Sequence, residues 1–171
     1  MTVSMYSVSV PVFMQHLNGL SGVLDKAAAH AAARKIKEED LLGMKLAPDM
    51  FPLLRQVRTA TDHAVNAAAR LAGKELPKFA NDETTIAQLK DRVTQAIAFL
   101  KSVKPGEIDG TEDKDISITF PNGNVREFKG QGLLIGNSLP NFYFHVTTAY
   151  DILRQCGVEL GKRDFMGTPP A

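Results

Sequence analysis

The chain has 171 residues, a length typical of one domain that buries a core without disulfide bonds or metal ions. Its 20 basic residues balance 19 acidic ones, and neither sign forms a long block, which argues against nucleic acid as a partner. The sequence has no signal peptide, no run of about 18 apolar residues and a single cysteine, Cys156. We therefore predict a cytoplasmic protein with one domain over residues 1–171 and no membrane partner.

The first predicted helix covers most of residues 3–31. Apolar residues recur there in alternating steps of three and four, which is the period of an amphipathic helix. Because proline is tolerated in a first turn but kinks a helix interior, Pro11 favours a start near residues 7–9. Residues 35–48 lose the period, so they are predicted to form a connection with a short helical turn at residues 38–42.

Two further helices follow. An apolar stripe over residues 50–71 predicts the second helix, with Asp49 as its N-cap and Gly73 as its stop. The third helix is expected to open at Thr85, because Gln88 three residues later completes a capping box.

The period changes in the last third of the chain. Ile116, Ile118 and Phe120 alternate with polar residues, and the turn-forming residues 121–124 follow them, so a β-hairpin is predicted between the third and fourth helices. A lone hairpin is marginally stable in water, so it must lie on the helices or pair with another chain. The fourth helix is expected over residues 139–156, with a proline in its first turn. Four amphipathic helices favour an all-α four-helix bundle that carries the hairpin as an appendage.

His145 is the anomalous polar residue of the fourth helix. At about 100° per residue it projects into the middle of an apolar face that contains Phe142 and Ile152, with Asn141 at the edge. A buried neutral imidazole must satisfy a donor and an acceptor, so it needs a hydrogen-bonding partner, a water or a metal. Two interpretations stay open: a satisfied core histidine, or a ligand or general base.

The same projection places the other candidate groups. His63 turns about 120° away from the stripe of the second helix, whereas Thr61 is the polar residue inside that stripe and a candidate for ligand binding. Tyr150 is the second ligand-binding candidate, on the fourth helix. His16 and His30 lie off the centre of the first helix and are interpreted as surface groups.

Several sequence blocks carry a family resemblance: SVPVF at 9–13, LAPDM at 46–50, LPNFYFHVTTAYDILR at 139–154 and GVELGKRDF at 157–165. With these blocks the chain resembles an uncharacterised domain-of-unknown-function family within the DinB/YfiT-like superfamily. The resemblance spans nearly the whole chain and implies a four-helix bundle. Many members of that superfamily are regarded as metalloenzymes, some of them thiol-dependent transferases or isomerases of small molecules.

The resemblance also implies a metal site. In those members the metal is held by one histidine of the second helix and by two histidines, four residues apart, on the last helix. His145 matches the second of the last-helix pair, His63 lies near the second-helix ligand, and Asn141 stands at the remaining position. Zinc or nickel is the implied cofactor, although a catalytic zinc takes three protein ligands and a water, and at most two of the three histidines are present.

Two functions are therefore expected as alternatives. In the first, a divergent DinB-like bundle binds a small molecule in its groove, with His145 and Asn141 as catalytic residues of metal-assisted transfer chemistry. In the second, the chain is a non-catalytic binding or self-associating module without a metal. Small residues such as Ala60 and Ala67, or the edge of the hairpin, would then form the surface of a homodimer.

Overall fold

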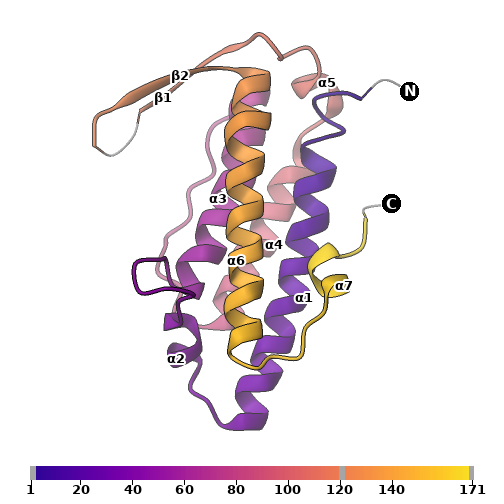
Figure 1. Ribbon diagram of the computed structural model, residues 1–171. Helices are drawn as coiled ribbons and strands as arrows, with labels where there is room; N and C mark the ends of the chain where they lie inside the picture. Colours follow the sequence, from indigo (N-terminus) through magenta and orange to yellow (C-terminus); the bar gives the residue numbers. More distant parts are fainter. Residues whose placement is uncertain (1–2, 120–121, 170–171) are drawn as a thin grey trace.

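The computed structural model describes residues 3–119 and 122–169, and these are mostly helical. The long helices, which lie side by side in Figure 1, are α1 (Val10–Arg34), α3 (Leu53–Ala72), α4 (Ile86–Ser102) and α6 (Leu139–Gln155). The shorter elements are α2 (Glu38–Gly43), α5 (Pro105–Ile108), the strands β1 (Asp115–Thr119) and β2 (Val125–Lys129), the π-helix η1 (Gly132–Ser138) and α7 (Lys162–Met166). The prediction of a mostly helical chain with a small antiparallel hairpin is confirmed. None of the described helices is both long and apolar enough to cross a membrane.

The long helices pack around one apolar core. The stripe of α3 is rich in alanine, and Ala60, Ala64 and Ala68 are fully buried. Short side chains let neighbouring helix backbones approach closely, and α3 makes its most extensive contact with α6. The close approach of α3 and α6 places polar residues at the edges of both helices next to each other.

Local sequence signals set most of the helix starts. As expected, α1 begins at Val10 with Pro11 in its first turn. The capping box of α4 is also present, since Thr85 Oγ1 accepts a hydrogen bond from the Gln88 backbone at 3.2 Å. The N-cap predicted at Asp49 is wrong, because α3 begins at Leu53 with Pro52 before it. Pro52 has extended backbone, with ψ at 163°, so the helix begins only after it.

The last long helix, α6, begins at Leu139 as predicted, but a helical segment that was not predicted precedes it. Helical backbone starts at Gly130, passes through the π-helix η1 and continues directly into α6. Pro140 lies in the first turn of α6, as predicted, and it also follows a helical segment. In an α-helix the proline ring clashes with the carbonyl four residues earlier, and the wider π-helical turn before Pro140 relieves this crowding.

The hairpin is attached to the C-terminal end of α3. Lys114 Nζ donates to the carbonyl oxygens of Arg70 at 3.0 Å and Leu71 at 2.9 Å, two of the last carbonyl groups of the helix. Ile116 pairs with Phe128, and Ile118 with Arg126. Phe120, the third apolar residue of the predicted first strand, lies outside the described residues. In Figure 1 the hairpin projects sideways from one end of the long helices, past α3.

The C-terminal helix α7 packs on α1 at a glycine. A Cβ atom at Gly19 would lie 2.8 Å from the Phe165 carbonyl oxygen and 2.9 Å from that of Asp164. Gln15 Nε2 on α1 also donates to the Met166 carbonyl at 2.9 Å. Only a residue without a side chain allows the two backbones to come this close.

Replacing Gly19 with alanine is expected to loosen α7 and to lower the free energy of unfolding by about 1–3 kcal/mol, because the α7 backbone must move. Trypsin cleavage after Lys162 and Arg163 should then accelerate. Gly22→Ala is the matched control, since its Cβ would meet open space and alanine gains about 1 kcal/mol in helix propensity. Equal cleavage rates for the two variants would contradict this packing.

Candidate functional site

His145 of α6 is buried and hydrogen-bonded across the helices to α3. It is 7% exposed, and its Nδ1 lies 2.6 Å from Gln56 Oε1. The amide of Gln56 is oriented by a second bond, from its Nε2 to the Phe51 carbonyl at 3.0 Å. Because Oε1 can only accept, His145 Nδ1 carries the proton and Nε2 is left as an acceptor. The predicted inward orientation and hydrogen-bonding partner of His145 are both present.

His63 stacks on His145, so the expectation that it turns away from the core is wrong. The ring centroids are 5.7 Å apart and the ring planes differ by 13°. The ring of Phe51 is also nearly parallel to that of His145, with centroids 6.2 Å apart. A helical projection locates His63 at the edge of the α3 stripe, and the close contact between α3 and α6 makes that edge part of the groove.

Burial lowers the pKa of both imidazoles. Desolvation is the largest cause at His145, and nearby positive charge on His63 and Arg55 adds to it, so that its pKa falls to about 4. At His63 desolvation alone lowers the pKa from its usual value near 6.5. The two rings are therefore neutral at pH 7, and each can accept a proton.

A cavity of about 420 Å³ opens beside this pair, between α3, the hairpin and the junction of η1 with α6. His63 lines it, whereas His145 lies behind His63. The lining residues are His63, Asn66, Ala67 and Arg70 of α3, Ile118 and Arg126 of the hairpin, and Leu133, Asn137, Ser138 and Asn141 of η1 and α6.

Several polar side chains of this cavity make no hydrogen bond within the part of the chain that the structure describes. They include the amide of Asn66, the guanidinium of Arg70 and the hydroxyl of Ser138, although Ser138 is only 3% exposed. Asn141 differs, because its Nδ2 donates to the Asn137 carbonyl at 2.7 Å. The cavity thus presents polar groups that have no hydrogen-bonding partner among the described residues.

The donor groups do not fit the metal site that the family resemblance implies. Within residues 3–119 and 122–169, no three His, Cys, Asp or Glu side chains gather where they could hold a metal ion. His145 and His63 lie together, but the third position is Asn141, and amide groups are poor ligands for zinc or nickel. Two imidazoles without a third ligand do not make a catalytic metal centre of the three-ligand type.

Residues 5–166 match a domain of unknown function, DUF1993. The chain belongs to the DUF1993 family. The DUF1993 fold is also close to a crystal structure of a DinB family member protein from Shewanella denitrificans, with a TM-score of 0.86 and 37% sequence identity. The match covers 97% of this chain and 93% of that one. No curated protein matches the chain.

The structure does not bring Thr61 or Tyr150 to the cavity of the DUF1993 domain. Thr61 is fully buried, where its Oγ1 accepts a hydrogen bond from Arg92 Nε at 2.7 Å. Tyr150 packs near Phe165 of α7, with ring centroids 6.1 Å apart. It follows His145 by five residues, which is about 140° around the helix, so the two side chains leave α6 in different directions.

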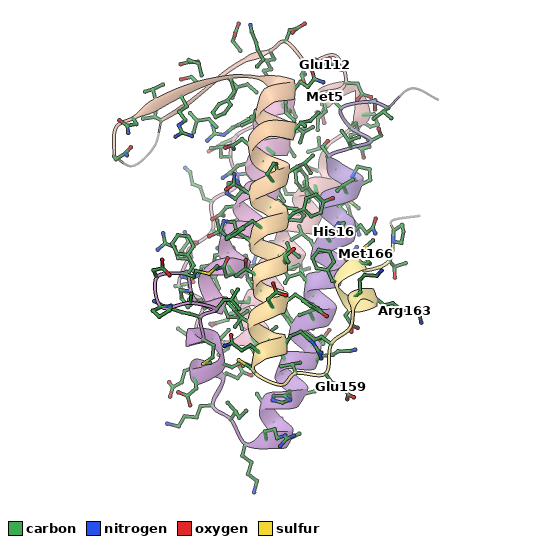
Figure 2. The ribbon with its side chains drawn as sticks, viewed as in Figure 1. Met5, His16, Glu112, Glu159, Arg163 and Met166 are labelled. Carbon is green, nitrogen blue, oxygen red and sulfur yellow. The ribbon has the colours of Figure 1, made fainter. Side chains whose placement is uncertain are left out.

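His16 is buried, so its interpretation as a surface group is wrong. It is 6% exposed, and its Nδ1 donates to the Val12 carbonyl at 3.0 Å. Its ring lies 5.0 Å from that of Tyr143 and 5.4 Å from that of Phe165. Figure 2 shows His16 beside α7, where Met166 is also labelled. The covering by α7 could not be expected, because the residues after Leu160 carry no helical period.

Sequence reasoning named His63 but missed Asn66 and Arg70, which share the α3 wall of the cavity with it. His63, Asn66 and Arg70 are spaced by three and four residues, so they share one face of the helix. This spacing is the signal that could have found them. It is common on helix faces exposed to water, and only the neighbouring hairpin and η1 turn the face into a cavity wall.

Proposed function

We propose that the long helices form a four-helix bundle and that the DUF1993 domain binds a small polar molecule in the cavity between α3 and the η1–α6 junction. The hairpin, inserted before the last long helix, would cover the ligand. The observation that carries this proposal is that Asn66, Arg70 and Ser138 line the cavity with side chains that form no hydrogen bond to the described residues. The cavity volume also lies in the range of small-molecule sites, which is about 300–1,000 Å³.

Ser138 supports a bound partner most directly. Its hydroxyl oxygen is accessible from the cavity, so a ligand there can reach it. Ser138 is 3% exposed and forms no hydrogen bond to the described residues, yet it lines the cavity. A ligand that accepts or donates at this position would satisfy the hydroxyl.

His63 is the group that we assign to proton exchange with the ligand. It lines the cavity, it is neutral at pH 7, and it has no hydrogen bond to the described residues. His145 stacks behind it and is held by Gln56, so His145 acts as a positioning residue. Asn141 keeps its side-chain oxygen as an acceptor for the ligand, since its nitrogen is bonded to Asn137. No metal enters this proposal, because the donor groups do not fit one.

Asn66→Trp is expected to abolish binding in the cavity, because the indole would fill the space that a ligand needs. Binding would be measured by ligand-observed NMR with a panel of small carboxylic acids, phosphate esters, alcohols and amides. Ile118→Trp should act in the same way from the hairpin wall, and Lys101→Trp on the exposed face of α4 is the control. Compounds that bind all four proteins equally would contradict the proposal.

Self-association is the second candidate function, favoured by exposed apolar side chains. Ile135 of η1 and Phe144 of α6 are 51% and 53% exposed. Burial of such side chains against a second copy of the chain would stabilise a homodimer. Sedimentation velocity should then show a dimer for the wild type and a monomer for Phe144→Ser. A strictly monomeric wild type would exclude this function.

A further inference from the structure

The charged side chains around the cavity are basic. Arg70 of α3 and Arg126 of β2 line it, and none of the described lining residues is Asp or Glu. The chain as a whole has nearly equal numbers of basic and acidic residues, so this imbalance is a property of the cavity and not of the composition. A site with this charge favours ligands that carry a negative charge.

Arg70 differs from the other partly buried arginines in having no carboxylate partner. Arg92 is paired with Glu83 at 2.9 Å and with Asp62 at 2.6 Å, and Arg58 lies 2.5 Å from Glu83. Arg70 forms no ion pair with the described residues, and desolvation alone lowers its pKa. Removing a guanidinium from water without an anion is unfavourable, so an anion supplied from outside would stabilise it.

Neutral donors line the same cavity as this guanidinium. Asn66 precedes Arg70 by one helical turn and shares its face of α3, while Ser138 contributes a hydroxyl from η1. A planar guanidinium that shares a cavity with amide and hydroxyl donors suits the oxygen atoms of a carboxylate or a phosphate.

From this geometry, and resting on the function proposed above, we infer that the ligand of the cavity carries an oxyanion that binds Arg70, with Ser138 and Asn66 as neutral donors. The shared chemistry is a group with two or more negatively charged oxygens, either a carboxylate or a phosphate ester. His63, at the neighbouring position of the same α3 face, then lies beside the uncharged part of the ligand.

Inorganic phosphate and malonate serve as the two probes, each compared with sodium chloride at equal ionic strength. At least one of them should raise the thermal midpoint of the wild type above the chloride value, and the responding probe identifies the type of oxyanion. Arg70→Gln is expected to weaken the apparent affinity about tenfold or more, which is the size of a lost charge-assisted hydrogen bond. Arg70→Lys keeps the charge and should retain part of the effect.

Arg34→Gln is the matched control, because Arg34 is exposed at the far end of α1. Circular dichroism without added anions establishes that all variants are folded. Shifts that are no larger than those in chloride, or equal in Arg70→Gln and Arg34→Gln, would overturn the inference. A second result would also overturn the inference but leave the proposed function standing. In that result the anions have no effect, and the protein binds neutral compounds whose binding is blocked by Asn66→Trp and unchanged by Arg70→Gln.

Discussion

Replacing Arg92 with methionine is expected to lower the free energy of unfolding by about 3–5 kcal/mol. This is the usual cost of removing one partner of a buried ion pair and leaving the other charge buried. Arg92 is 2% exposed. Its guanidinium donates to Thr61 Oγ1 at 2.7 Å, Asn81 Oδ1 at 2.8 Å, Glu83 Oε1 at 2.9 Å and Asp62 Oδ1 at 2.6 Å. It therefore ties α4 to α3 and to the segment between them.

The loss would arise chiefly from the buried carboxylate of Glu83, because the Asp62 side chain is 42% exposed. Without Arg92, Glu83 keeps Arg58 as its only cation, and Asp62 loses its only ion pair among the described residues. Methionine is apolar and of similar length, so it fills the space without replacing the charge. The contact of the Arg92 guanidinium with the Phe79 ring, 4.1 Å from its centroid, is lost as well.

Urea unfolding followed by circular dichroism measures this change. Arg34→Met is the matched control, because an exposed arginine on α1 should change the free energy of unfolding by less than about 0.5 kcal/mol. Adding Glu83→Gln to Arg92→Met should recover part of the loss, because the buried negative charge is then removed. A loss below about 1 kcal/mol in Arg92→Met would show that the network contributes little.

The protein is expected to lose about 2 kcal/mol of stability through His145 alone as the pH falls from about 7.5 to 5. The pKa of His145 is about 4 in the folded protein, below its usual value near 6.5. The unfolded chain therefore binds the proton first, and protonation favours unfolding. The contribution of His145 is fully present above pH 6.5 and is lost progressively as the pH falls toward 4.

His145→Gln isolates this contribution, because glutamine does not titrate. The free energy of unfolding of both proteins would be measured by urea denaturation at several pH values between 7.5 and 5. The wild type should show the steeper decline. Glu83, whose pKa lies below its usual range because of its bonds to Arg92, titrates in both proteins, so its effect cancels in the difference. Parallel pH profiles would contradict the assignment of a buried neutral imidazole at position 145.

Arg92 and His145 both take hydrogen-bonding or stacking partners from α3. This helix supplies Asp62 and Thr61 to the arginine on α4, and Gln56 and His63 to the imidazole on α6. Substitutions in α3 therefore disturb two polar networks, on opposite neighbours of the same helix. The thermal midpoint of each variant should be compared before a loss of binding is attributed to the cavity.

Features that depend on a few adjacent residues could be predicted from the sequence alone. The capping box at Thr85, the start of α1 at Pro11 and the hairpin near Ile116 all follow from local backbone preferences and from hydrophobic periodicity. The inward orientation of His145 follows in the same way, because a helix fixes the direction in which each side chain leaves it.

Only the tertiary structure determined which residues line the cavity. A helical period locates His63 and Arg70 at the edge of α3, but it does not say whether water, a hairpin or another helix lies against that edge. The alanines of α3 allow α6 to come close, which stacks His63 on His145, and the hairpin covers the face that carries Arg70. Which side chains meet thus depended on the spacing between elements far apart in the sequence, a property that no local pattern contains.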